Sequence, residues 1–236
     1  MAEVFDGCDV VIAMLANGAA LDEVLGHGGG VFEVSLAGRT LVNMGTVAPA
    51  CSRRLHDDIR AAGGRYVEAP VSGSRVPAQD GALVAMLAGD PEAVAEVARL
   101  VEPLCAATFH CGEVPRALEL KLAVNVYLIA TVTGLAEAMR FADSRGLDRG
   151  LVRAVLDAGS MASPLSRVKA AKLVERDLSP QAAVRDVLYN NRLILDAAAE
   201  SGASMPLLHA CAALFARAVE RGHGEHDMVA VVEGIA

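Results

Sequence analysis

The sequence contains no tryptophan and few aromatic residues of any kind. Aromatic residues make up 3% of the 236 positions, so stacking platforms for single-stranded nucleic acid are not expected. Basic residues are also in the minority, with 21 Lys and Arg against 29 Asp and Glu, and no Lys/Arg block occurs. Because a protein that follows a phosphate backbone needs a positive surface, we do not expect nucleic acid as a partner.

Cysteine is sparse and lacks metal-binding spacing. The five cysteines are an odd number without a CxxC pair, which argues against a zinc site and against a secreted disulfide framework. Residues 1–7 are acidic and lack the basic start and apolar run of a signal peptide. The longest apolar stretch, residues 122–136, is shorter than the ~20 residues of a membrane span. We therefore expect a cytoplasmic protein without a metal site or a membrane partner.

Apolar residues, in contrast, make up 53% of the chain, enough to bury a core over one domain or two compact ones. In residues 1–112, short apolar runs alternate with helical patterns. Strands are predicted at 9–15, 40–44, 65–69, 83–87 and 108–110, helices at 19–25, 49–62 and 91–104, and a glycine loop at 28–30. This alternation predicts a layered α/β domain over residues 1–112.

The pattern changes from residue 113 onward. Apolar residues recur at helical spacing over 119–144, a run longer than most globular helices. Further helices are predicted at 149–158, 165–176, 180–200, 205–221 and 227–234. We expect an all-α domain over residues 113–236, opened by one long helix.

Two polar turns follow predicted strands, at the end of the strand where open α/β sheets bind ligands. Ser72-Gly73-Ser74 offers two hydroxyls and an amide that could hold a carboxylate or hydroxyl of a ligand. Asn43-Met44-Gly45-Thr46 offers another free hydroxyl. Both segments also fit ordinary loops, and the residues alone leave both interpretations open.

Lys121 and Asn125 form a third candidate because they lie four residues apart, on one face of the long helix. The residues around them are mostly apolar. Burial disfavours the charged form of a lysine, and a lysine tuned towards neutrality can act as a general acid or base. A lysine whose stem lies along apolar surface with its ammonium in water fits the same pattern.

The glycine-rich residues 26–30 follow a predicted helix rather than a strand, so they do not form a dinucleotide-binding turn.

Several of these motifs together resemble the β-hydroxyacid dehydrogenase family, which includes 3-hydroxyisobutyrate dehydrogenase and, more distantly, 6-phosphogluconate dehydrogenase. The resemblance covers nearly the whole chain, and the sequences of the motifs are most similar to those of the glyoxylate/succinic semialdehyde reductase branch. The motifs that carry it are Pro70-Val71-Ser72-Gly73-Ser74, Asp80-Gly81-Ala82-Leu83, Ala88-Gly89-Asp90, Lys121-xxx-Asn125 and Gly159-Ser160-Met161-Ala162-Ser163-Pro164.

The resemblance implies an NAD(P)-dependent oxidoreductase that moves hydride between nicotinamide and a small hydroxy acid, aldehyde or keto acid. The similarity to the reductase branch slightly favours NADP over NAD as the cofactor. Lys121 would be the catalytic acid/base, and Asn125 would orient both substrate and lysine. The other implied roles are substrate binding by Ser72, Gly73 and Ser74, and cofactor binding by Leu15, Asn17, Thr46 and Tyr189. A homodimer that buries the long helix is also implied.

The chain departs from the family pattern at three places. Its first strand resembles the family's fourth, so the Rossmann-type parallel sheet should be incomplete and lack the GxGxxG turn. We therefore expect these 236 residues alone to bind NAD(P)H poorly and to show no measurable turnover. Ala117 replaces a family glycine, and Tyr189-Asn190 replaces a Lys-Asp pair. Two alternatives stay open: a catalytically inactive dimeric interaction protein, and a reductase of an imine or another carbonyl substrate.

Overall fold

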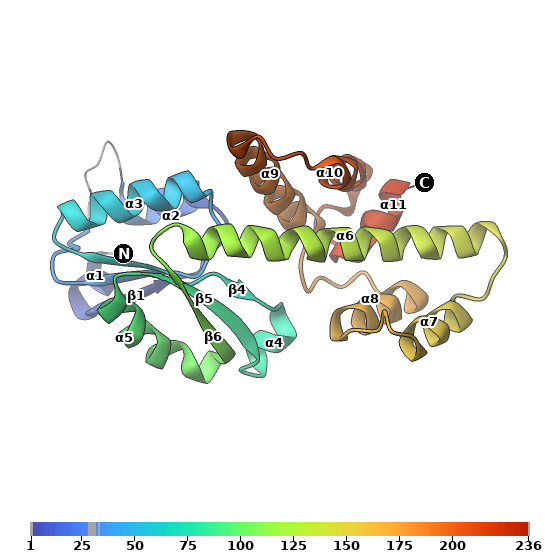
Figure 1. Cartoon of the computed structure of the whole chain (residues 1–236), viewed down its shortest axis with the longest axis horizontal. Helices are drawn as coiled ribbons and strands as arrows, with labels where there is room; N and C mark the ends of the chain where they lie inside the picture. The colour runs from blue at the N-terminus through green and yellow to red at the C-terminus, as the bar shows by residue number, and fades with distance from the viewer. Residues whose placement is uncertain (1, 28–31, 33, 236) are drawn as a thin grey trace. The chain divides into compact units, whose positions relative to one another are not determined.

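The computed structural model describes residues 2–27, 32 and 34–235. These residues form two compact units, Met1–Val124 and Asn125–Ala236, each of which is described separately below (Figure 1). The glycine loop predicted at 28–30 lies outside the described residues.

The first unit is an α/β domain, as the alternating pattern predicts. In chain order its elements are α1 (Ala2–Gly7), β1 (Val10–Ala13), α2 (Gly18–Leu25), β2 (Thr40–Asn43), α3 (Pro49–Ala61), β3 (Arg65–Glu68), β4 (Val71–Ser72), α4 (Arg75–Gln79), β5 (Leu83–Gly89), α5 (Pro91–Val101), a 3₁₀ turn (Glu102–Leu104), β6 (Cys105–Gly112) and the first turns of α6 (Arg116–Ser144).

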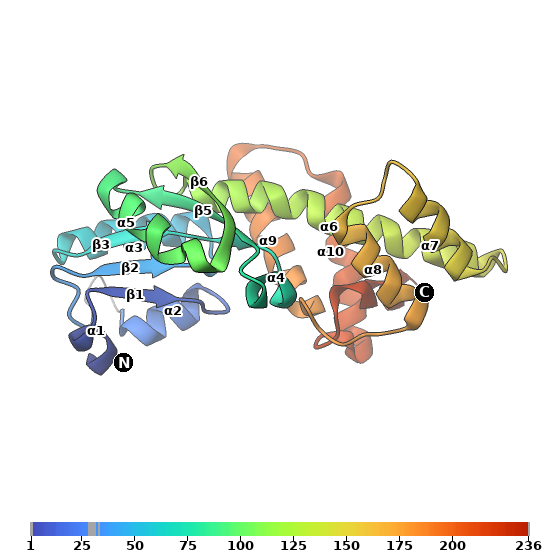
Figure 2. The ribbon, with the colours of Figure 1, turned by 90° about the horizontal axis from the view of Figure 1, so that it is seen from below.

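The sheet is mostly parallel. β1, β2 and β3 run parallel to one another, and β5 runs parallel to β6. Figure 2 labels β1, β2, β3, β5 and β6 of this sheet. β3 and β4 both pair antiparallel with β5. The antiparallel step follows from the chain itself: only the short α4 separates β4 from β5, whereas a parallel connection needs a longer crossover.

Alternate residues of the strands build a core on each face of the sheet. Leu41 and Tyr66 belong to the cluster that includes residues of α1, α2 and α3. Their neighbours Val42 and Val67 belong to the cluster that includes α5. Helices therefore cover both faces, which explains why the strands read as nearly continuous apolar runs (Figure 1).

Several boundaries differ from the sequence-based prediction. Val71–Ser72, predicted to lie in a turn, form the short strand β4, and β6 extends over Cys105–Gly112 rather than 108–110. α1 and α4 were not predicted because helices of five or six residues give no resolvable period. α6 begins at Arg116, earlier than predicted, and α5 ends at Val101, where the 3₁₀ turn begins.

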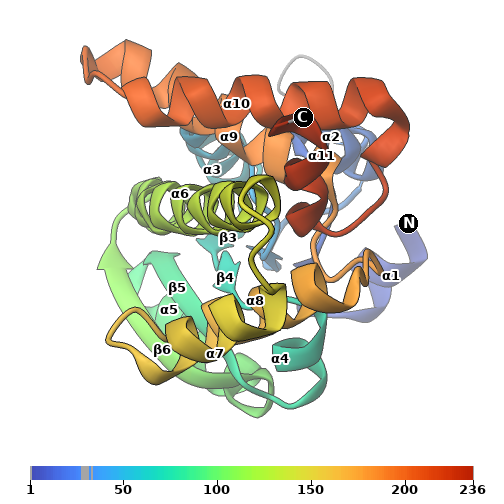
Figure 3. The ribbon, with the colours of Figure 1, turned by 90° about the vertical axis from the view of Figure 1, so that its right-hand side faces the viewer.

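The second unit is helical, as predicted, and its described residues contain no strand beyond an isolated bridge between Ala183 and Asp227. Besides most of α6 it contains α7 (Arg149–Ala158), α8 (Pro164–Glu175), α9 (Val184–Ser201), α10 (Pro206–Ala218), a π-helical turn (Val219–His223), a 3₁₀ turn (Met228–Val231) and α11 (Val232–Ile235). α7 packs on α8, and α10 packs on both α9 and α11 (Figure 3).

α6 is 29 residues long and extends beyond the apolar stretch 122–136 at both ends. By length and composition alone it could cross a membrane, which the shorter stretch could not. In this protein 44% of its most apolar 18-residue stretch is buried, and the core helices of soluble proteins can have the same length and composition. Lys121, Asn125 and Thr133 are buried polar residues along it.

Candidate functional site

The turns that follow β1 and β2 lie in direct contact. Gly45 comes so close to the first turn that an added Cβ would lie 2.7 Å from the carbonyl oxygen of Leu15. A Cβ at Gly18 would lie 3.0 Å from the sulfur of Cys51, at the start of α3. The structure thus brings together the segments that carry three predicted cofactor residues, Leu15, Asn17 and Thr46.

Asn17 also has a local structural role. Its Oδ1 accepts a hydrogen bond from the Ala20 amide at 2.9 Å and caps the N-terminus of α2. Thr46 and Leu15 are half-buried. This hydrogen bond therefore orients the Asn17 side chain within the turn after β1, where the family resemblance places cofactor-binding residues.

The predicted substrate loop begins within β4 rather than in a turn. Ser72 pairs with Val84 of β5, and Ser74 occupies the N-cap position of α4. Gly73 between them has φ 125°, and an added Cβ would lie 2.7 Å from a methyl carbon of Leu83. The positive φ of this residue favours glycine, because side chains rarely adopt that conformation.

Lys121 is buried on the second turn of α6, with 9% of its surface exposed. Among the residues that the structure describes, none provides a hydrogen-bond or ion-pair partner for its Nζ. Burial lowers the pKa of Lys121 from 10.5 to about 8. Its amine can therefore both release and accept a proton near neutral pH, which is what a general acid/base requires.

Asn125 lies one turn further along α6 and is 3% exposed. Its Oδ1 is buried without a hydrogen-bond partner in the described part of the chain. An unsatisfied buried amide oxygen is costly, so a hydroxyl donor brought by a ligand would be stabilised there. Lys121 and Asn125 thus offer a donor and an acceptor, neither of them paired with another described residue.

Glu68, at the end of β3, is a buried acid that was not predicted from the sequence. It is 0% exposed, and its Oε2 accepts hydrogen bonds from the amides of Ala117 and Leu118 at 3.1 and 3.2 Å. Oε1 accepts from the Ser52 hydroxyl. Burial raises the pKa of Glu68 to about 7, against the lowering effect of these hydrogen bonds. The carboxylate therefore lies directly under the first turn of the Lys121 helix.

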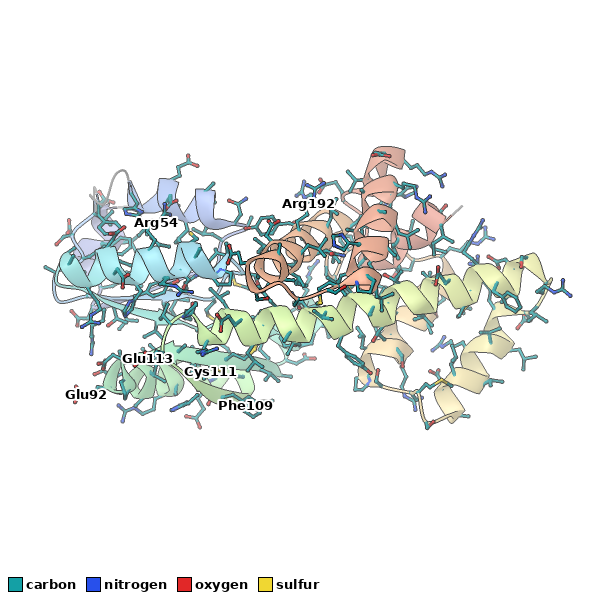
Figure 4. All side chains as sticks on the ribbon, turned by 45° about the horizontal axis from the view of Figure 1, so that its top comes forward. Arg54, Glu92, Phe109, Cys111, Glu113 and Arg192 are labelled. Atoms are coloured by element: carbon teal, nitrogen blue, oxygen red, sulfur yellow. The ribbon has the colours of Figure 1, made fainter. Side chains whose placement is uncertain are left out.

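The start of α6 packs on the sheet through apolar contacts as well. Ala117 is fully buried in a cluster with Met86 and Ala88 of β5. Cys111 of β6 packs against the same cluster and is labelled in Figure 4. The methyl group of Ala117, at the family's glycine position, thus fills space between α6 and β5.

Comparisons with known proteins show the family to which the chain belongs. Residues 1–112 match the family model described as the NAD binding domain of 6-phosphogluconate dehydrogenase. Residues 117–235 match the model described as NAD-binding of NADP-dependent 3-hydroxyisobutyrate dehydrogenase. Glyoxylate/succinic semialdehyde reductase 1 of Arabidopsis thaliana is 32% identical over 99% of this chain and 81% of its own length. The chain belongs to the β-hydroxyacid dehydrogenase family.

Several other proteins are similar to this β-hydroxyacid dehydrogenase chain in sequence or fold. The cytokine-like nuclear factor N-PAC of Aedes aegypti is 29% identical over 97% of this chain and 41% of its own length. A crystal structure of 3-hydroxyisobutyrate dehydrogenase from Salmonella typhimurium superposes with a TM-score of 0.89 at 21% identity, covering 98% of this chain and 81% of that one. Psf3 in complex with NADP+ and 2-OPP has a TM-score of 0.87 at 21% identity, with coverage of 100% and 83%.

This β-hydroxyacid dehydrogenase chain carries Tyr189 on α9, within the second unit. Tyr189 and Asn190 are both half-buried, and Asn190 Oδ1 has no hydrogen-bond partner in the described part of the chain. Their part in cofactor binding stays a prediction.

Proposed function

We propose that the protein catalyses hydride transfer between NADPH or NADH and a small aldehyde or keto acid, or the reverse oxidation of a hydroxy acid. The observation that carries this proposal is Lys121, a buried and unpaired lysine whose pKa lies near 8. It stands on the opening turns of α6 in a chain that matches NAD-binding models over both of its units.

In this proposal the residues of the chain bind the substrate and move its proton. Lys121 donates a proton to the carbonyl oxygen during reduction and removes it from the hydroxyl during oxidation. Asn125 accepts a hydrogen bond from the substrate hydroxyl and holds it toward Lys121. Ser72 and the Gly73 amide hold the carboxylate. The nicotinamide supplies or accepts the hydride when it is bound.

The cofactor is proposed to lie at the turns after β1 and β2. Leu15, Asn17 and Thr46 would hold it there. The contact between these two turns supports the assignment, because both lie at the carboxyl ends of parallel strands. NADP is favoured over NAD by the reductase resemblance and by the NADP+ complex of one structural neighbour.

The test is steady-state oxidation of NADPH and NADH with glyoxylate and succinic semialdehyde, and reduction of NADP+ and NAD+ with 3-hydroxy acids. The protein is assayed as its gene encodes it, with any in-frame coding sequence upstream of Met1 included. We expect turnover with at least one acid. Failure of every substrate, together with no fluorescence change on NADPH titration, would favour the inactive interaction protein instead.

We also infer that the protein forms a homodimer through α6. Leu120, Tyr127, Gly134 and Phe141 are spaced seven residues apart and so share one face of this helix. That face is open, with Tyr127 74% and Phe141 66% exposed. An apolar stripe of this length along an exposed helix marks an interaction surface, and a second copy offers a matching one.

Replacing Tyr127 and Phe141 together by glutamate is expected to convert the dimer into a monomer of 24.4 kDa at micromolar concentration. Charges at the centre of an apolar interface raise its dissociation constant by about 30-fold or more. Light scattering measures the mass. Leu151→Glu is the control, since Leu151 is an equally exposed apolar residue on α7. A monomer without any substitution would contradict the inference.

A further inference from the structure

A continuous line of buried hydrogen bonds runs from the turn after β2 toward β3. The Gly45 amide donates to Asn43 Oδ1 at 3.0 Å, and Asn43 Nδ2 donates to the Tyr66 hydroxyl at 3.2 Å. The Tyr66 hydroxyl lies 2.9 Å from Ser52 Oγ, and Ser52 donates to Glu68 Oε1. Because Glu68 also accepts the two amides at the start of α6, the line joins the proposed cofactor turn to the Lys121 helix.

The direction of every proton in this line is fixed at its first link. The Gly45 amide can only donate, so Asn43 must present its oxygen there and its NH₂ group to Tyr66. Burial raises the pKa of Tyr66, so its hydroxyl keeps its proton and donates it to Ser52. Ser52 then has one hydrogen left, which points to Glu68. The line therefore ends on a group that accepts three hydrogen bonds, as a carboxylate does.

The way α6 is capped differs from the other capped helices of the chain. In α2, α5, α7 and α8 the capping side chain belongs to the residue directly before the helix: Asn17, Asp90, Asp148 and Ser163. At α6 the acceptor is Glu68, which lies 49 residues before the Ala117 amide that it binds. The first turn of α6 is thus fixed to the sheet rather than to its own preceding loop.

We propose that Glu68 is a positioning residue for Lys121, and that Asn43, Tyr66 and Ser52 transmit its position from the cofactor turn. This inference rests on the proposed function, since it concerns the site formed by that turn and Lys121. Lys121 follows the two bound amides by one turn of a rigid helix. A shift of Glu68 therefore displaces the lysine, and small displacements of a catalytic group are costly to the rate.

Other titratable groups surround Glu68 and act on its charge. Glu119 on the first turn of α6 opposes its ionisation. Burial raises the pKa values of Tyr66 on β3 and Cys111 on β6, and the charge of Glu68 adds a smaller contribution in the same direction. No lysine or arginine of the described chain pairs with Glu68. Its charge is compensated by hydrogen bonds alone, so their geometry decides where the carboxylate lies.

The decisive variant is Glu68→Gln, which keeps the side-chain length and removes one acceptor. The new NH₂ group faces the Ser52 hydroxyl, whose hydrogen points at it, so the side chain must move away from Ser52 or from the amides of α6. We expect kcat to fall about 10-fold while the KM values for cofactor and substrate stay within about 3-fold. Thr133→Val is the control, because it removes a buried hydroxyl of α6 that bonds only to its own helix.

The double variant Ser52→Ala/Glu68→Gln separates positioning from simple loss of stability. Both substitutions break the same line of hydrogen bonds, so we expect kcat of the double variant to fall no further than that of Glu68→Gln alone. Two independent destabilising substitutions would instead have additive effects. Should Glu68→Gln not fold, Ser52→Ala breaks the same line without touching the carboxylate, and the same loss of kcat is expected.

An unchanged kcat in Glu68→Gln, or a double variant whose loss of kcat is the product of the two single losses, would overturn the positioning role. The same series includes Lys121→Ala. If that variant keeps full activity, the proposed function itself fails. If it loses activity while Glu68→Gln does not, only the positioning role of Glu68 fails.

Discussion

Replacing Lys121 by alanine is expected to lower kcat by about 100-fold or more, the usual contribution of a general acid/base. The lysine is buried and unpaired, so no neighbouring group of the described chain can take over the proton. Lys121→Arg distinguishes proton transfer from simple charge. Arginine keeps the positive charge but does not deprotonate, so it should be as inactive as alanine.

The pH dependence of the rate gives an independent check with opposite signs in the two directions. The pKa of Lys121 is about 8, so the ammonium form that donates a proton predominates below pH 8. Carbonyl reduction should therefore decline above about pH 8, whereas hydroxy-acid oxidation should decline below it. Profiles that rise and fall together in both directions would contradict the assignment of Lys121.

The same burial has a cost in stability. The folded protein lowers the pKa of Lys121 from 10.5 to about 8, so below pH 8 folding must bury a charge that the unfolded chain keeps in water. This cost disappears as the pH rises from 8 to 10.5, where the unfolded chain binds the proton and the folded one does not. Lys121→Met should therefore be more stable than the original protein at pH 7, by up to about 3 kcal/mol, and no more stable at pH 10.5. Urea unfolding at both pH values measures this.

The sequence predicted those features that depend on local pattern. The strands predicted at 40–44 and 65–69 agree to within one residue with β2 and β3, and the helix predicted at 149–158 agrees with α7. The strands are short apolar runs and the helix has a helical period, and each is followed by a stop signal. β4 was missed because two residues carry no period, and Pro70 separates them from β3. Lys121 and Asn125 lie on one helix, α6, as their spacing of four residues predicts, and their catalytic role stays a prediction.

Long-range polar pairs could not be predicted in this way. Glu68 carried a signal, since an acid in a strand that is buried on both faces needs a partner. Its partners, Ser52 and the amides of Ala117 and Leu118, lie 16, 49 and 50 residues away. No sequence period relates such positions, because only the packing of α3 and α6 against the sheet brings them together. A second pair of this kind, Lys169 and Asp227, lies in the helical unit.

Lys169→Met is expected to destabilise the protein by about 3–5 kcal/mol, the cost of leaving a buried charge without its partner. Lys169 Nζ lies 2.9 and 3.0 Å from the two carboxylate oxygens of Asp227, and both side chains are almost completely buried. Asp227 also accepts the amides of Gln181 and Val229 at 2.9 and 3.2 Å. The carboxylate thus joins α8, the segment before α9 and the 3₁₀ turn before α11.

Two further variants show whether the charge itself is responsible. In Lys169→Met/Asp227→Asn the carboxylate is neutralised while an oxygen remains to accept the backbone amides, so about half of the lost stability should return. Arg185→Met is the matched control, because it breaks an ion pair with Glu225 whose two side chains are 60% and 70% exposed. Exposed pairs contribute at most about 1 kcal/mol. Urea unfolding monitored by circular dichroism measures all three, and a loss in Lys169→Met no larger than in Arg185→Met would show that the buried pair contributes little to the stability of the helical unit.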